Sequence, residues 1–115
     1  MYQRGIRGAI TIDSNTQNAV RTSVVSLISE IKNRNNFENK DISHVIFTLT
    51  DDINCIYPAK IAREEFKDWA EVPMVCMNEM KIENSITTCL RIPIVINTNL
   101  AQSDINHVYL KGAQV

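Results

Sequence analysis

One arginine of this sequence stands inside a segment that is otherwise apolar. Arg91 interrupts the apolar run of residues 89–96. A guanidinium in a buried strand is seldom left without an anionic partner, because desolvation of the charge is costly. Arg91 is therefore expected to reach an edge of the sheet, to pair with an internal carboxylate, or to line a pocket for an anionic ligand.

Arg7 raises the same question near the start of the chain. It stands between Gly5 and Gly8, where the missing side chains let a backbone or a ligand approach closely. In a regular strand Arg4 and Arg7 face opposite sides of the sheet. Only one of these two arginines is therefore expected to face any given pocket.

One acid and a basic pair complete the set of charged candidates. Glu79 lies between Met77 and Met80, where a carboxylate either orients a hydroxyl group or simply points into solvent. Lys60 and Arg63 share one face of a predicted helix, and such a face is by default a solvated basic surface. Two arginines, this basic pair and one acid together favour a site for a small dianionic molecule.

The sequence contains none of the common motifs of covalent or cofactor-dependent chemistry. It has no G-x-S-x-G nucleophile motif, no Walker loop and no dinucleotide-binding fingerprint. Neither the two histidines, His44 and His107, nor the three cysteines show the spacing of metal ligands. Cys55, Cys76 and Cys89 are expected to be free thiols in a reducing compartment. We therefore expect a site without a metal ion or a cofactor.

Hydrophobic periodicity predicts the elements that must position these side chains. A β-branched stretch predicts a strand over residues 4–12, and apolar spacing predicts a helix over about residues 15–34, with a Ser14/Gln17 capping box. Pro58 opens a second predicted helix whose apolar face extends to Trp69. Further strands are expected at residues 45–50, 73–77, 89–96 and 108–110. The β-α-β-α-β-β order favours an α/β (α+β) fold, with helices on one face of a mixed sheet.

Length and composition are those of one ordinary domain spanning residues 1–115. The chain is 44% hydrophobic and 22% charged, and 12 basic against 13 acidic residues give a formal charge of −1. This balance argues against general nucleic-acid binding. No apolar run is long enough to cross a membrane, and the first residues show no secretion signal, so a cytoplasmic location is expected. A chain of this size buries little of its own surface, which favours an oligomer.

Six segments, in order and over nearly the whole chain, carry a resemblance to a known family. They are residues 4–9, residues 57–60 with Arg63, residues 72–73, residues 76–80, residues 89–91 and residues 107–110. Together they resemble the small monofunctional chorismate mutases of the Bacillus type. The resemblance implies a homotrimer, a trimeric pseudo-α/β-barrel with active sites at the subunit interfaces. It also implies conversion of chorismate to prephenate in aromatic amino-acid biosynthesis, by a Claisen-type pericyclic rearrangement without covalent intermediate, metal or cofactor.

The same resemblance implies a role for each candidate residue. Arg91 is expected to donate to the ether oxygen and to a substrate carboxylate, and Arg7 to bind a carboxylate. Glu79 would accept a hydrogen bond from the substrate hydroxyl with Cys76 beside it, and Tyr109 would donate to a carboxylate. The implied substrate-binding residues are Arg7, Val75, Cys76, Met77, Asn78, Glu79, Arg91 and Tyr109, with Tyr57, Lys60 and Arg63 from the neighbouring subunit.

Three features depart from the family pattern. Val75 stands where threonine is common, which removes one side-chain hydrogen bond to the substrate. Tyr57 replaces a phenylalanine and adds a hydroxyl to an apolar wall. Relatives carry a longer C-terminal tail beyond the position of Tyr109, so weaker substrate retention is expected. None of these changes touches Arg7, Glu79 or Arg91, and activity is therefore expected to survive.

Two other functions are compatible with the same residues. Val75 and the short tail would suit a non-catalytic trimeric module that binds a metabolite in the same intersubunit pocket. An imine-hydrolysing enzyme of the related trimeric deaminase fold also places an arginine in an intersubunit cleft. The segment of residues 76–80 does not belong to that deaminase family, which makes this third interpretation the weakest.

Overall fold

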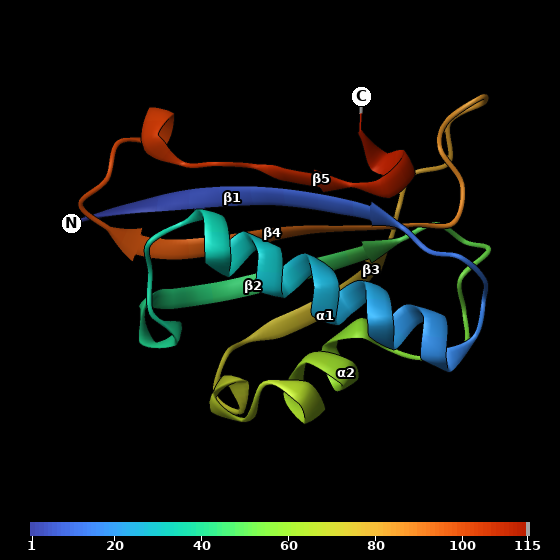
Figure 1. Cartoon of the computed structure of the whole chain (residues 1–115), viewed down its shortest axis with the longest axis horizontal. Coiled ribbons are helices and arrows are strands. Elements are labelled where there is room, and N and C mark those ends of the chain that lie inside the picture. Colours follow the sequence, from blue (N-terminus) through green and yellow to red (C-terminus); the bar gives the residue numbers. More distant parts are fainter. Residues whose placement is uncertain (115) are drawn as a thin grey trace.

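Two α-helices cover one side of a five-stranded mixed sheet in the computed structural model, which describes residues 1–114 (Figure 1). The elements are β1 (Tyr2–Thr11), α1 (Gln17–Arg34), β2 (Ile42–Leu49), α2 (Pro58–Glu65), β3 (Met74–Asn78), β4 (Cys89–Thr98) and β5 (Val108–Leu110). Short 3-10 turns lie at Asn39–Asp41, Lys67–Trp69, Gln102–Asp104 and Lys111–Ala113. The predicted β-α-β-α-β-β order is confirmed, and the short last strand follows it.

The sheet places the arginine-bearing strand in its centre. The strand order is β3-β2-β4-β1-β5. β4 runs antiparallel to both β1 and β2, whereas β3 and β5 pair in parallel with β2 and β1 at the two edges. Arg91 on β4 consequently lies opposite Ala9 on one neighbouring strand and Thr48 on the other.

The main core lies between α1 and the sheet. The apolar face of α1 is fully buried, and its members are Val20, Val24, Leu27, Ile28 and Ile31. A Cβ atom added to Gly8 would lie 2.7 Å from the Cδ1 atom of Ile31, whereas one added to Gly5 would meet nothing within 4 Å. Gly8 therefore permits the close approach of α1 to β1, and Gly5 has no such role within this chain.

Two local predictions are corrected by the structure. The N-cap of α1 is Thr16, whose hydroxyl accepts from the backbone N–H of Ala19 at 3.2 Å, so the Ser14/Gln17 capping box is absent. α2 ends at Glu65, because Phe66 adopts an extended backbone and a 3-10 turn carries Trp69 into the core.

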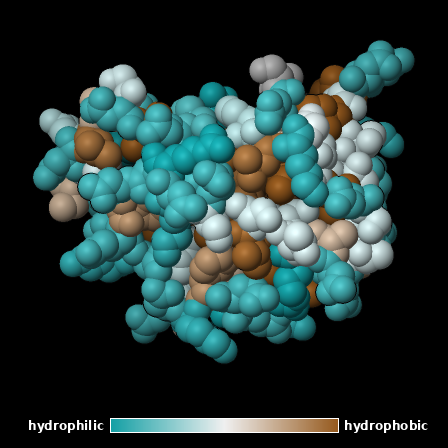
Figure 2. Space-filling view, viewed as in Figure 1, coloured by the Kyte–Doolittle hydropathy of each residue, from teal (hydrophilic) through white to brown (hydrophobic). Residues whose placement is uncertain are grey.

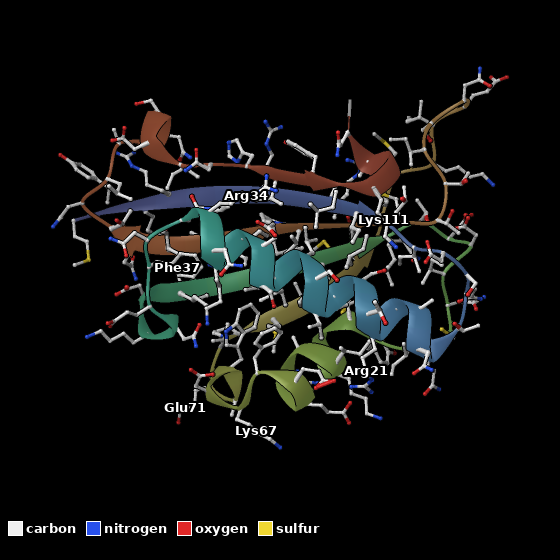
Figure 3. The ribbon with its side chains drawn as sticks, viewed as in Figure 1. Arg21, Arg34, Phe37, Lys67, Glu71 and Lys111 are labelled. Atoms are coloured by element: carbon white, nitrogen blue, oxygen red, sulfur yellow. The ribbon has the colours of Figure 1, made fainter. Side chains whose placement is uncertain are left out.

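Ion pairs on the outer surface connect α1 to α2. Arg21 on α1 lies beside α2 (Figure 3), and its guanidinium contacts Glu64 at 2.9 Å and Glu65 at 3.4 Å. The hydrogen bond from Arg21 lowers the pKa of the Glu64 carboxyl. Figure 2 shows hydrophilic side chains over most of this helix-bearing side. Among residues 1–114, no helix has the length and apolar character needed to cross a membrane.

Candidate active site

The side of the sheet that carries no helix, here called the open face, holds an arginine–glutamate pair. Alternation along β4 buries Leu90 and Ile92 in the main core and turns Arg91 to the open face. The Nε–H group of Arg91 donates to Oε1 of Glu79 at 2.6 Å. The side chains are 36% and 18% exposed, so this charge-assisted bond lies in a partly desolvated environment.

The pair leaves hydrogen-bonding capacity for a ligand. Arg91 uses its Nε–H group for Glu79, and its Nη nitrogens make no hydrogen bond to any residue within 1–114. Glu79 likewise keeps its Oε2 atom without a hydrogen-bond partner in this part of the chain. Of the alternatives left open for Arg91, the structure shows the pairing with an internal carboxylate. The same guanidinium still presents donors to the open face.

Cys89 lies next to this pair in the sequence but is a buried structural residue. Its side chain is fully buried in a small cluster with Ala9, Ala113 and, at the edge, Tyr109. Burial raises the pKa of the Cys89 thiol above its ordinary value, although the positive charge of Arg91 acts in the opposite direction. Cys89 therefore stays a neutral thiol at pH 7 and is not a nucleophile.

Arg7 lies on the open face one strand away from Arg91. It is exposed and stands opposite Pro93 in the β1–β4 pair. Arg4 turns to the other side, where its Nε–H group donates to the carbonyl oxygen of Leu100 at 2.9 Å. The parity argument is thus confirmed, and only Arg7 shares a face with Arg91.

His107 fixes the backbone at Arg7 and was given no role by the sequence. The backbone N–H of Arg7 donates to Nδ1 of His107 at 2.9 Å, so the proton of the neutral ring is on Nε2. Burial, and then the positive charge of Arg7, lowers the pKa of His107. The ring is consequently neutral at pH 7. Its only sequence signal is its position in the segment of residues 107–110.

The edge strands complete the open face. Tyr109 on β5 pairs with Ala9 and so faces the same side as Arg7 and Arg91. At the other edge Val75 and Met77 on β3 are 50% and 53% exposed. The open face thus brings together six of the predicted site residues: Arg7, Val75, Met77, Glu79, Arg91 and Tyr109.

The remaining predicted residues gather on the helix side. A cavity of about 580 Å³ lies between the start of α2 and the end of β3, and its lining includes Tyr57, Lys60, Cys76 and Asn78. Pro58 occupies the first turn of α2, as predicted, and this start presents Tyr57 with 70% of its surface exposed. Arg63 follows along α2 as an exposed side chain outside the cavity lining.

Cys76 belongs to the helix-side group and does not share the open face with Glu79. It pairs with the buried Phe47 and packs against the main core, so its side chain faces the helices. Within residues 1–114, no group of three or more His, Cys, Asp or Glu side chains is placed to hold a metal ion. One chain therefore divides the predicted site residues between the two sides of its sheet.

Comparison with known proteins confirms the resemblance seen in the sequence. Residues 3–115 match the family model of chorismate mutase type I. The chain is similar to chorismate mutase AroH of Bacillus subtilis (strain 168), with 32% identity over 115 residues, 100% of this chain and 90% of that protein. It is also similar to chorismate mutase AroH of Thermus thermophilus, with 32% identity over 111 residues, 96% of this chain and 89% of that protein. The solved structure of chorismate mutase from Clostridium thermocellum, Cth-682, superimposes with a TM-score of 0.89 and 37% identity, covering 95% of this chain and 96% of that one. Because the family model matches nearly the whole chain and these relatives are similar over their length, the chain belongs to the type I chorismate mutase family.

Proposed function

We propose that this chain converts chorismate to prephenate, in aromatic amino-acid biosynthesis, at sites shared between neighbouring subunits of a homotrimer. In this rearrangement an ether C–O bond breaks while a C–C bond forms within one molecule, so no proton, electron or second reactant is exchanged. The protein must therefore hold the compact substrate conformer and stabilise charge that develops on the ether oxygen. The observation that carries the proposal is the Arg91–Glu79 pair on the open face.

Arg91 is assigned to the charge that develops in the transition state. Its Nε–H group is held by Glu79, so the direction of the guanidinium is set before the substrate binds. The Nη groups then donate to the ether oxygen and to a substrate carboxylate. Donors that are fixed in advance stabilise the developing charge without reorganising during the reaction.

Three further residues of the open face are assigned to binding. Arg7 and Tyr109, on adjacent strands, donate to substrate carboxylates. Oε1 of Glu79 accepts from Arg91, which leaves Oε2 to accept from the substrate hydroxyl. These contacts favour the compact conformer in which the reacting carbon atoms are close.

The separation of the candidate residues supports an intersubunit site. Tyr57, Lys60 and Arg63 lie at and beyond a cavity on the helix side, away from the open face of their own chain. Large apolar side chains are also exposed in the segment between β3 and β4. Met80 and Ile82 lie there, with 76% and 54% of their surface exposed. In the proposed trimer, the start of α2 from one subunit closes the open face of the next. Each site is then incomplete without its neighbour.

A direct assay tests the activity. The purified protein is mixed with chorismate, and loss of its ultraviolet absorbance is followed together with the appearance of prephenate. We expect a rate far above that in buffer. Absence of any acceleration would refute the proposed reaction, and tight binding of chorismate without turnover would support the non-catalytic binding module in its place.

A subunit-mixing experiment tests the shared site. Arg91→Ala subunits lack the open-face half, and Arg63→Ala subunits lack the helix-side half. If the two variants are unfolded and refolded together in equal amounts, about a quarter of the interfaces of a cyclic trimer combine two intact halves. Mixed samples are then expected to recover up to that share of wild-type activity, whereas a site built within one chain predicts no recovery.

The proposal also includes a cytoplasmic location and a single catalytic domain formed by residues 1–115. The three cysteines are free thiols in the described part of the chain, as suits a reducing compartment. Finding the protein in a cytosolic fraction, with its thiols reduced by mass spectrometry, would support this location.

A further inference from the structure

A strained threonine closes the loop between the two members of the Arg91–Glu79 pair. Residues 79–88 join β3 to β4, with Glu79 at the start of the loop and Arg91 shortly after its end. Thr88 has a φ angle of 46°, in the left-handed region. This conformation is costly for a β-branched side chain and persists only where neighbouring groups impose it.

The carboxylate of Asp52 contacts the backbone of this threonine. It lies in the turn after β2 and accepts the backbone N–H of Thr88 at both oxygens, at 3.0 and 3.2 Å. The carbonyl oxygen of Thr88 in turn accepts from the backbone N–H of Ile12 at 2.7 Å. A charged acceptor forms stronger hydrogen bonds than a neutral one. The backbone N–H and the carbonyl oxygen of Thr88 are therefore both hydrogen-bonded to the surrounding structure.

The same turn also holds the two neighbouring points of the loop. The hydroxyl of Thr50 donates to Asp52 and accepts the backbone N–H of Cys89 at 2.9 Å. At the other end of the loop, the backbone N–H of Glu79 donates to the carbonyl oxygen of Leu49 at 2.8 Å. Residues 49–52 thus anchor both ends of the loop that separates Glu79 from Arg91.

We propose that Asp52 is a positioning residue, which holds Thr88 in its left-handed conformation and so fixes the start of β4 and the placement of Arg91 against Glu79. This inference rests on the proposed reaction, because Arg91 must be placed for the transition state. Asp52 makes its hydrogen bonds to residues of its own chain and is given no contact with substrate. Its loss should therefore lower kcat more than it raises KM.

A glycine substitution gives a test that a general loss of stability would not reproduce. Asp52→Ala should lower kcat by about 10-fold or more, the value of a hydrogen bond to a charged group. Thr88→Gly alone should have little effect, since glycine adopts positive φ without strain. In the double variant, Thr88→Gly should restore most of the lost kcat, because the conformation no longer needs the carboxylate. The matched control is Asp51→Ala, which removes the exposed neighbouring carboxylate that pairs with Lys81 at 3.6 Å and should leave kcat near wild type.

The outcomes separate this inference from the proposed function. If the wild-type protein does not accelerate the rearrangement, the proposed function fails. If wild type is active and Asp52→Ala keeps its kcat, or loses it without recovery by Thr88→Gly, the positioning role is refuted. Should Asp52→Ala not fold, Asp52→Asn, which keeps one oxygen acceptor, is compared with and without Thr88→Gly in the same assay. Circular dichroism shows whether Asp52→Ala folds, and therefore whether the alanine pair or the asparagine pair of variants is compared.

Discussion

Replacement of Arg91 by alanine and by lysine tests the assignment of the central cation. Alanine removes both the proposed donor to the ether oxygen and the partner of Glu79. Loss of one preorganised oxyanion donor typically lowers kcat by about 10²- to 10³-fold, or roughly 3–4 kcal/mol of transition-state stabilisation. We therefore expect Arg91→Ala to lose at least ~10²-fold in kcat.

Lysine separates charge from geometry. In the structure the Arg91 Nε–H group contacts Glu79 at 2.6 Å while the Nη groups remain available, so two tasks are divided between different nitrogens of one planar group. A lysine ammonium offers a single nitrogen, which Glu79 attracts away from the substrate. Arg91→Lys is therefore expected to lose a large part of the same ~10²-fold, although the charge is kept.

Steady-state turnover of chorismate, followed by its ultraviolet absorbance, measures both variants. Arg4→Ala is the matched control, because this arginine of β1 turns away from the open face to the carbonyl oxygen of Leu100. Its kcat should stay near that of wild type. Near-normal turnover by Arg91→Ala would show that the assigned cation is wrong, and near-normal turnover by Arg91→Lys would show that a point charge is sufficient.

Three further predictions concern stability and reactivity. Gly8→Ala should lower the free energy of unfolding by about 1–3 kcal/mol through overpacking against α1, whereas Gly5→Ala, whose added Cβ meets nothing within 4 Å, should change the urea midpoint much less. The pKa of His107 is lowered in the folded state, so its contribution to stability is present above its ordinary pKa of about 6.5 and is lost as the pH falls through the folded value. Urea titrations above and below pH 6.5 measure how much free energy of unfolding is lost on acidification. This loss should be smaller for His107→Asn than for wild type, and an equal loss in the two proteins would contradict the assignment. Cys89, fully buried with a raised pKa, should resist alkylation in the native protein and react in urea, as read by mass spectrometry.

The spacing of apolar residues was sufficient to predict the helices and strands but not the residues at which they begin and end. The apolar spacing of α1 and the alternation of β4 depend on burial against the core, and the structure follows both. Ser14 and Thr16 are both suitable capping residues, and the extended backbone at Thr16 decides which one is used. The apolar spacing of the sequence predicts that the face of α2 continues to Trp69. Its indole N–H instead donates to Asn39, from a separate 3-10 turn after the helix.

The candidate residues could be selected from the sequence one by one, but their arrangement in space could not. Arg91 was identified because a charge in an apolar strand needs a partner, yet nothing local indicates that Glu79 is that partner. Their contact depends on the insertion of β4 between β1 and β2, which is a long-range property of the sheet. The positive φ of Thr88 had no signal at all, because threonine disfavours the conformation that the turn after β2 imposes.

The two arginines of the open face are each fixed through the backbone of their strand. His107 accepts the N–H of Arg7, and Asp52 holds the residue that precedes β4. A pericyclic reaction needs no nucleophile, base or metal, so its rate depends on where the donors stand when the substrate folds between them. A misplacement of about 1 Å from a remote change can cost about 10²-fold in rate. Residues that touch no substrate are therefore expected to matter here through the backbone they hold. The position of the guanidinium groups, more than their charge alone, should then set the rate.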